Sequence, residues 1–170
     1  MLIVISGLPG TGKTAVAAGV AARLHAVHLS IDTAEDAMLG AGLTPGWETG
    51  VAAYEVTRAA AEQNLALGWD VVVDAVNDSE PARQTWRHAA EHAAVALRFV
   101  LLTCSDQQEH RRRLESRRRG LRHLPEPTWG DVESRACAYE PWTDHYVLID
   151  TSAPLETVIE ATHRRLAQSR

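Results

Sequence analysis

A single segment, GLPGTGKT at residues 7–14, constrains what this chain can fold into more than any other part of it. An apolar run, Leu2–Ile5, lies just before the segment, and a helix-like stretch, Ala15–Leu24, follows it. The pattern GxxxxGK[ST] forms a phosphate-binding loop when it joins a strand to a helix in this way. The sequence therefore predicts a strand, a glycine-rich loop and a helix in immediate succession.

The residue types of this segment suit a polyphosphate. Its glycines allow successive backbone N–H groups to face one concavity, and the following helix adds the positive end of its dipole. Lys13 is the single lysine of a chain with 17 basic residues. It occupies the position of the motif from which a compact, flexible ammonium reaches the β- and γ-phosphates. Thr14 is expected to be a Mg²⁺ ligand. The residues expected to hold the nucleotide are Gly7, Leu8, Pro9, Gly10, Thr11, Gly12, Lys13 and Thr14.

Short apolar runs alternate with longer helical stretches, which predicts an α/β fold with a parallel sheet covered on both faces. The runs Val71–Val73 and Val100–Leu102 are continuous rather than alternating, as expected for strands buried on both faces. The length favours one domain, residues 1–170. The expected strands are Leu2–Ser6, Val27–Ile31, Asp70–Asp74, Leu97–Thr103 and Tyr146–Asp150, and the expected helices are Ala15–Leu24, Gly50–Leu67, Pro81–His92, Asp106–Arg119 and Leu155–Gln168.

Two carboxylates, Asp32 and Asp74, come at the ends of expected strands. Ligands of open α/β sheets bind at the carboxyl ends of the strands, so Asp32 is predicted to take the proton of an acceptor hydroxyl and Asp74 to hold Mg²⁺ or its waters. For each residue, an ordinary role as turn former or helix cap stays an alternative. Glu35 and Asp36 are interpreted as first-turn acids of a helix, outside the site.

Seven arginines fall between residues 111 and 122. On a helix from Asp106, Arg113 and Arg117 lie four residues apart on one face, where they can close over phosphates as charge spreads in a transition state. Residues 106–127 would then form a small lid that excludes water and limits ATP hydrolysis. Two other interpretations stay open: a solvated helix with Glu–Arg pairs, and a patch that binds nucleic-acid backbone.

Charge, cysteine content and hydropathy argue against several functional classes. There are 22 acidic and 17 basic residues, a net charge of −5, which argues against general nucleic-acid binding but leaves a local arginine patch open. Cys104 and Cys137 are too few and too far apart for a metal knuckle. No stretch approaches the roughly 20 apolar residues of a membrane span. We expect a soluble cytoplasmic protein with no membrane partner, and the sequence does not indicate its oligomeric state.

Taken together, these features resemble the small bacterial P-loop kinases related to shikimate and gluconate kinases, chloramphenicol phosphotransferase and the kinase half of polynucleotide kinase. The resemblance covers almost the whole chain. It implies a three-layer α/β/α P-loop NTPase fold with five parallel strands in the order 2-3-1-4-5, transfer of the γ-phosphate of ATP with Mg²⁺, and packing of the loop at Thr151 on the adenine. It rests on GLPGTGKT, Asp32, VVVDAVN at 71–77, Arg83, the segment 104–117 with its RxxxR spacing, and LIDT at 148–151.

The acceptor is expected near two irregular regions, residues 39–47 and 124–142, which mix glycine, proline and tryptophan. Trp129 and Trp142 are candidates to wall a pocket, as are Trp47 and Tyr139. Arg58 and Arg83 are candidates to bind a polar or anionic group of the acceptor. Each of these side chains could instead anchor packing or cover a helix surface.

Three functions remain in competition. The first is an ATP-dependent kinase that phosphorylates a hydroxyl of a small molecule such as a sugar, nucleoside or antibiotic. The second is a polynucleotide 5′-hydroxyl kinase, which is disfavoured because those enzymes carry an arginine shortly after the acid on strand two, whereas the next basic residue after Asp32 is Arg58. The third is a non-catalytic ATP-binding regulatory module. With no lysine beyond Lys13, the guanine-reading NKxD motif of ordinary GTPases is absent.

Overall fold

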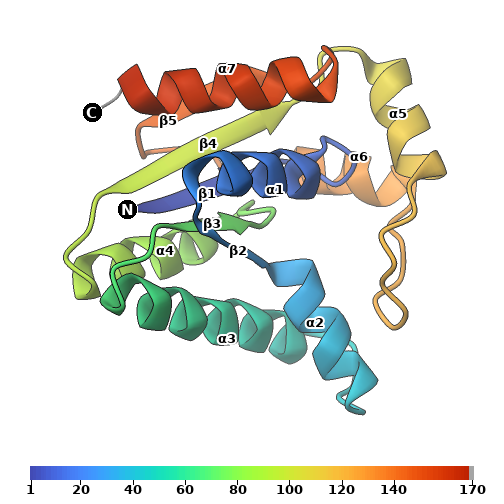
Figure 1. The fold of residues 1–170 in the computed structure, drawn as a ribbon. Coiled ribbons are helices and arrows are strands. Elements are labelled where there is room, and N and C mark those ends of the chain that lie inside the picture. The colour runs from blue at the N-terminus through green and yellow to red at the C-terminus, as the bar shows by residue number, and fades with distance from the viewer. Residues whose placement is uncertain (169–170) are drawn as a thin grey trace.

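The computed structural model describes residues 1–168 and contains a five-stranded parallel sheet with helices on both faces (Figure 1). The strand order is β2-β3-β1-β4-β5, which confirms the predicted order 2-3-1-4-5. The strands are β1 (Leu2–Ser6), β2 (Val27–Ser30), β3 (Val71–Asp74), β4 (Leu97–Thr103) and β5 (Tyr146–Asp150). The helices are α1 (Lys13–Leu24), α2 (Ile31–Gly40), α3 (Trp47–Ala66), α4 (Glu80–His92), α5 (Gln107–Ser116), α6 (Trp129–Ala138) and α7 (Leu155–Gln168).

Two apolar cores lie on opposite faces of the sheet, because successive side chains of a strand point to opposite faces. Ile3 and Ile5 of β1 pack with residues of α1 and α7, whereas Leu2 and Val4 pack with residues of α3 and α4. Every residue of β1 and β3 is buried. The run Val71–Val73 is therefore part of a strand covered on both sides, as the sequence predicts. In β4, Val100 and Leu102 are buried and Leu101 is half-buried.

The arginine-rich helix is shorter than predicted. The side chain of Asp106 caps α5 by accepting a hydrogen bond from the Glu109 backbone N–H at 3.0 Å. Arg117, with φ −64° and ψ 149°, already has an extended backbone, so the helix ends at Ser116 rather than at Arg119. Residues 117–128, which we call the lid loop, connect α5 to α6.

Helix α6 lies inside a region that the sequence suggested was irregular. Its N-terminus carries a capping box, in which the side chain of Thr128 accepts from the Asp131 N–H and that of Asp131 accepts from the Thr128 N–H. This reciprocal pair satisfies two backbone donors that a helix end otherwise leaves free. The prolines and tryptophans on either side obscured a signal that the spacing of Thr128 and Asp131 does contain.

The carboxyl ends of the parallel strands, together with α2, α5, the lid loop and α6, lie at one side of the molecule (Figure 1). The loop between β1 and α1 lies at the same edge because it follows the carboxyl end of β1, and all strands of the sheet are parallel. Among residues 1–168, no helix is both long enough and apolar enough to cross a lipid bilayer.

Candidate active site

The glycine-rich loop has a backbone that only glycine adopts easily. Gly7, Gly10 and Gly12 have φ values of 143°, 88° and 88°, in the range that L side chains rarely adopt. At Gly7 a β-carbon would also lie 2.5 Å from the carbonyl oxygen of Leu102. Gly12 is the N-cap residue of α1, so the free N–H groups of this helix face the loop. The loop thus has the concave shape that binds a phosphate group.

Lys13 lies at the first position of α1 and is 9% exposed. Its ammonium donates to the backbone carbonyl of Leu8 at 3.1 Å. Burial lowers the pKa of Lys13 to about 8, while the charges of Asp32 and Asp74 oppose that shift. The side chain is therefore mostly protonated at pH 7, and the desolvated charge is stabilised by whatever anion binds beside it.

Thr14 and Asp74 form the part of the site suited to a divalent cation. The Thr14 hydroxyl donates to Asp74 Oδ1 at 2.8 Å, and Asp74 Oδ2 lies 2.7 Å from His28 Nε2. Asp74 is 2% exposed. A hydroxyl and a carboxylate beside a phosphate-binding loop fit Mg²⁺, which binds through one or two protein oxygens together with phosphate oxygens and water. Both residues are where the sequence predicts a metal ligand, and their roles stay predictions.

Two adjoining hollows lie beside this loop. The first, which we call the lid cavity, has a volume of about 690 Å³ and is lined by Lys13 and by residues of α2, the lid loop and α6. The second, the aromatic cavity, has a volume of about 400 Å³ and is lined by residues of α2, α3 and α4. Five residues line both hollows and so mark where they meet: Asp32, Glu35, Val76, Asp78 and Arg135.

Asp32 lies in the first turn of α2, where the two cavities meet. Its carboxylate forms an ion pair with Arg119 of the lid loop. The polar atoms predicted to bind phosphate and to accept a proton, on Lys13 and Asp32, therefore line one hollow. A carboxylate at this boundary is placed to contact a group that enters from the aromatic cavity toward the loop.

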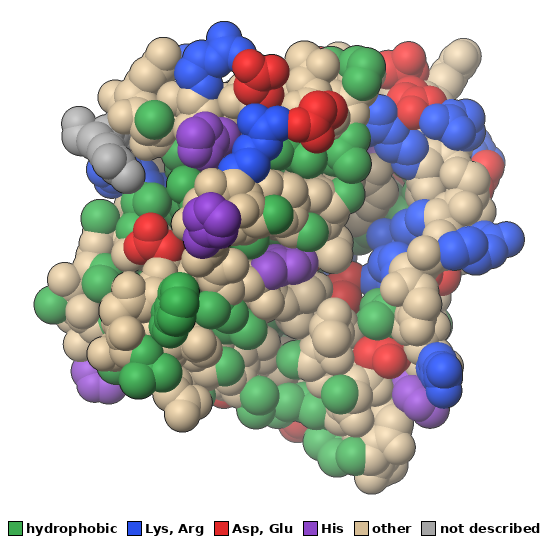
Figure 2. All heavy atoms as spheres, viewed as in Figure 1, with side chains coloured by type: hydrophobic (Ala, Val, Ile, Leu, Met, Phe, Trp, Pro, Cys, Tyr) green, Lys and Arg blue, Asp and Glu red, His purple; other side chains and the backbone are tan. Residues whose placement is uncertain are grey.

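Arg117 and Arg119 bring positive charge to the lid cavity, and both side chains are mostly buried. Glu126 bridges them: its carboxylate lies 2.6 Å from Arg117 Nε and 3.0 Å from Arg119 Nε. Burial and the neighbouring Arg119 charge lower the pKa of Arg117. Figure 2 shows basic side chains gathered over α5 and the lid loop, at the right of the view.

The prediction that Arg113 and Arg117 lie together on one helix face is wrong. Arg113 bonds Glu109 at 2.7 Å and donates to the backbone carbonyl of Thr151 at 2.8 Å, and it does not line the lid cavity. The two arginines diverge because the helix ends between them, at Ser116. The second arginine of the cavity is instead Arg119.

Thr151 is buried at the end of β5, next to β4. Its hydroxyl donates to the carbonyl of Thr103 at 2.9 Å, and its own carbonyl accepts from Arg113. These contacts fix the loop that the sequence predicts to pack on adenine, and that role stays a prediction.

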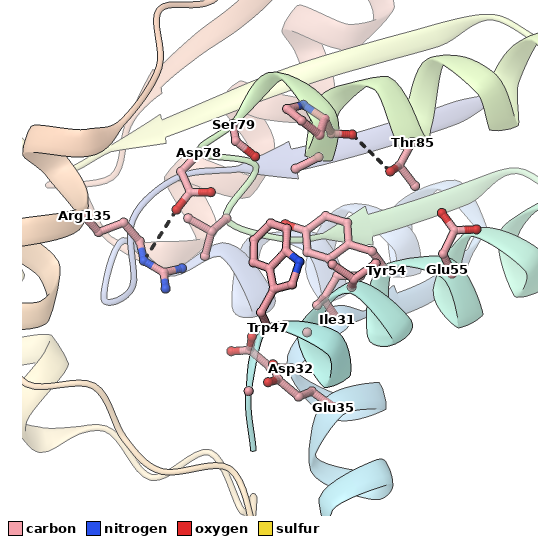
Figure 3. Close-up of a pocket in the computed structure, with 16 residues that line it drawn as sticks. Ile31, Asp32, Glu35, Trp47, Tyr54, Glu55, Asp78, Ser79, Thr85 and Arg135 are labelled. Atoms are coloured by element: carbon pink, nitrogen blue, oxygen red, sulfur yellow. Dashed lines mark hydrogen bonds and ion pairs between the residues drawn. The ribbon is translucent and has the colours of Figure 1, made fainter. Parts of the chain in front are cut away.

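The aromatic cavity takes its walls from the side chains of Trp47 and Tyr54 on α3 (Figure 3). Asp32 and Glu35 lie beside Trp47, and Asp78 and Arg135 project from the opposite side. Arg135 Nε is 3.5 Å from Asp78 Oδ2. Burial and the charge of Asp32 raise the pKa of Glu35.

Five other side chains predicted to contact the acceptor do not line either cavity: Arg58, Arg83, Trp129, Tyr139 and Trp142. The Tyr139 hydroxyl donates to the Val76 carbonyl at 2.9 Å. Arg83 is fully buried and donates to the carbonyls of Asn77, Glu140 and Pro141 at 2.6–3.1 Å. Its guanidinium stacks 4.3 Å from the ring centroid of Trp142, and Trp142 in turn packs on Phe99 and Tyr146. These two residues are structural.

Arg58 and Trp129 have partners elsewhere. Arg58 pairs with Glu55 and Glu62 along the surface of α3. Trp129 packs edge-on against His110, with ring centroids 5.1 Å apart, and bonds Glu133. His110 reaches the Pro9 carbonyl at 2.8 Å, so Trp129 supports the phosphate-binding loop from behind.

Several residues of the two cavities were not predicted from the sequence. Glu35 was assigned to the helix dipole alone, although its spacing of three from Asp32 places it on the same face of α2. Arg119 belonged to the recognised cluster but was not singled out. Asp78 and Arg135 had no recognisable signal, because they meet only through the fold: the Glu140 N–H donates to the Asp78 carbonyl at 2.9 Å and so joins the end of α6 to the loop after β3.

Comparison with known proteins supports this reading of the fold. Residues 2–138 match the profile of the family described as AAA domain, and no curated protein matches the sequence. Similar solved structures include a sugar kinase from Janibacter sp. (17% identity, 98% of this chain and 94% of that chain, TM-score 0.71). A gluconokinase from Sinorhizobium meliloti (22% identity, 98% and 93%, TM-score 0.66) is also similar. So is an APS kinase from Mycobacterium tuberculosis solved with AMPPNP and APS (19% identity, 98% and 96%, TM-score 0.70). At these identities the likeness concerns the fold.

Proposed function

This chain belongs to the AAA domain family, and we propose that within it the protein is a kinase, moving the γ-phosphate of ATP to a hydroxyl group of a small molecule. One observation carries this proposal: Lys13, Arg117, Arg119 and Asp32 line one cavity beside a phosphate-binding loop. Phosphoryl transfer needs positive charge around the transferred group and a base at the acceptor oxygen, and this cavity offers both.

Each residue has a role that follows from its position. The N–H groups at the start of α1 and the Lys13 ammonium bind the phosphates. Asp32 orients the acceptor hydroxyl and takes its proton as the oxygen attacks phosphorus, while the bond from phosphorus to the β–γ bridging oxygen breaks and ADP leaves. Arg117 and Arg119 offset the charge on the transferred group. Thr14 and Asp74 would hold Mg²⁺, which neutralises phosphate charge.

The ion pair between Arg119 and Asp32 suits such an enzyme. An arginine that turns toward a bound phosphate leaves this carboxylate free to accept a proton, so the base becomes available when nucleotide is present. Arg119 lies three residues after the end of α5, in a loop whose side chains can turn without disturbing the helix. This arrangement would limit reaction of the phosphate with water.

The similar structures support a kinase in particular. Their printed names are sugar kinase, gluconokinase and APS kinase, and the last was solved with AMPPNP, an ATP analogue. ATP is therefore the proposed donor. An acceptor of small size agrees with the volume of the aromatic cavity, about 400 Å³.

The test is an ATP-consumption screen over hydroxyl-bearing metabolites, nucleosides, antibiotics and oligonucleotides, with Lys13→Ala as the blank. Once an acceptor is found, Asp32→Asn should cut phosphoryl transfer by about 10²–10⁴-fold while ATP affinity measured by calorimetry stays nearly unchanged. Unchanged turnover in Asp32→Asn would remove this carboxylate from the mechanism. Transfer only to oligonucleotide 5′ ends would indicate a polynucleotide kinase, and ATP binding without any transfer would indicate a regulatory module.

A further inference from the structure

The charged side chains that line the aromatic cavity are mostly acidic, which limits the charge that an acceptor can carry. Four carboxylates line it, Asp32, Glu35, Glu55 and Asp78, against a single cation, Arg135. Arg135 already lies beside Asp78. Arg58, predicted to bind a polar or anionic group, does not line this cavity and is paired with two glutamates, and Arg119 is paired with Asp32. An acceptor with a carboxylate, phosphate or sulfate in this cavity would meet negative charge without a free partner.

Glu35 differs from the other three carboxylates. Asp32 is paired with Arg119, Glu55 with Arg58 and Asp78 with Arg135. Among the side chains of residues 1–168, none forms a hydrogen bond or ion pair with Glu35. It is nevertheless half-buried, and its pKa is raised by burial and by the Asp32 charge, which outweigh the opposing charges of Arg135 and Arg119. A cation bound beside it would relieve both effects.

The aromatic wall provides a second contact for a cation. Trp47 and Tyr54 are seven residues apart on α3, which places both on one face of the helix. Trp47 is 78% exposed although it lines a concave cavity. The face of an indole ring is the strongest aromatic partner for an ammonium group, and it also stacks on the body of a ring-shaped ligand.

Given the proposed function, on which this step rests, we infer that the acceptor is a hydroxyl-bearing organic amine, such as an amino sugar, an aminocyclitol or an aryl amino alcohol. Its ammonium lies between the Glu35 carboxylate and the ring of Trp47, and its hydroxyl faces Asp32. Glu35 and Asp32 are one helical turn apart on α2, so the amine and the reactive hydroxyl are held on neighbouring parts of one molecule.

The experiment compares matched acceptors that differ in charge. Each amine is assayed by ADP release beside its N-acetyl derivative and beside a carboxylate of the same skeleton. We expect free amines to have a kcat/KM at least tenfold above their N-acetyl derivatives, and the carboxylates to be inactive. Equal use of amine and N-acetyl compounds, or preference for carboxylates, would overturn the inference.

Variants assign the effect to the cavity. Glu35→Gln should lower kcat/KM for the amine by about 10- to 100-fold through loss of a charge-assisted contact, with KM for ATP unchanged. Trp47→Leu should raise KM for the amine. Glu48→Gln, next to Trp47 but outside the cavity, is the matched control and should behave as wild type. A Glu35→Gln enzyme with wild-type kcat/KM for the amine would contradict the inference.

Failure of this inference can be told apart from failure of the proposed function. Calorimetry with the Asp32→Asn variant and AMPPNP measures amine binding without transfer. If the amine binds when Glu35 is present and does not bind after Glu35→Gln, the inference holds even if wild type transfers no phosphate. Transfer to neutral or anionic acceptors, with no amine binding, would uphold the kinase and overturn the inference.

Discussion

Arg83 shows how a charged side chain can be entirely structural. Its guanidinium is fully buried and donates to three backbone carbonyls, two of them in the segment after α6. The flat fork of arginine satisfies several acceptors and stacks on an aromatic face at the same time, which a lysine ammonium does not do. Arg83 thereby joins the carbonyl of Asn77, the residue before the cavity residue Asp78, to residues 140–141.

Replacing this residue should therefore affect folding more than binding. We expect Arg83→Met to lower the free energy of unfolding by about 3 kcal/mol, because three carbonyl acceptors, of which that of Asn77 is buried, lose their donor. Urea denaturation gives this value. The control is Arg164→Met, on the exposed surface of α7, which should change it by less than about 0.5 kcal/mol. Normal stability combined with a raised KM for the acceptor would return Arg83 to the binding site.

At the scale of elements, two carboxylates of α2 contact the lid loop: Asp32 pairs with the Arg119 side chain, and Asp36 binds the loop backbone. Asp36 Oδ1 accepts hydrogen bonds from the backbone N–H groups of Arg122, His123 and Leu124 at 2.7–2.9 Å. These donors, that of Leu124 foremost, lower the pKa of Asp36. The pKa of Asp36 is lower in the folded chain than in the unfolded chain. The stabilisation from its hydrogen bonds is therefore fully present above about pH 4, and it is lost as the pH falls through the folded pKa.

We expect Asp36→Ala to release the lid loop. Amide hydrogen exchange at residues 122–124 should become about tenfold faster at neutral pH, because three backbone donors lose a charged acceptor. Asp36→Asn keeps one acceptor oxygen and should give an intermediate rate. Exchange elsewhere, for example in β1, should stay the same. Unchanged protection of residues 122–124 in Asp36→Ala would mean that the loop is held by its arginine contacts instead.

At the scale of the whole molecule, the phosphate-binding loop joins the central strand β1 to α1 and contacts α5. Helix α1 packs with α7 on one face of the sheet, and His110 ties α5 to the loop through Pro9. A ligand in the loop therefore contacts the folded state at its centre and has nothing comparable to bind in the unfolded chain. Binding should stabilise the protein as a unit.

This effect can be measured without an acceptor. At an ATP·Mg²⁺ concentration of about 100 times Kd, the gain is about 2.7 kcal/mol, which corresponds to a rise in Tm of roughly 5–10 °C for a chain of this size. Lys13→Ala should show little or no shift in a thermal scan, and Arg23→Ala, near the other end of α1, should shift like wild type. Equal shifts in wild type and Lys13→Ala would contradict nucleotide binding at this loop.

The sequence pattern by itself predicted the strands and the glycine-rich loop, while the strand order came from the family resemblance. The strands from Leu2–Ser6 to Tyr146–Asp150 agree with the structure to within one residue, because buried parallel strands need continuous apolar runs that are visible in any one segment. The loop at residues 7–14 was equally clear, since its glycines, Lys13 and Thr14 are neighbours in the chain. Thr14 and Asp74 were each predicted to be Mg²⁺ ligands, and the structure adds that their side chains form a hydrogen bond.

Only the tertiary structure decided which polar side chains face the cavities. Arg83 and Arg119 are both arginines in or beside helices, yet the first is buried among carbonyls and the second pairs with Asp32. Glu35 and Arg135 come from helices about a hundred residues apart and line one hollow. Sequence spacing describes neighbours along a single helix or strand, whereas these contacts depend on how α2, α6 and the lid loop pack together, which is set by long-range contacts that no local pattern records.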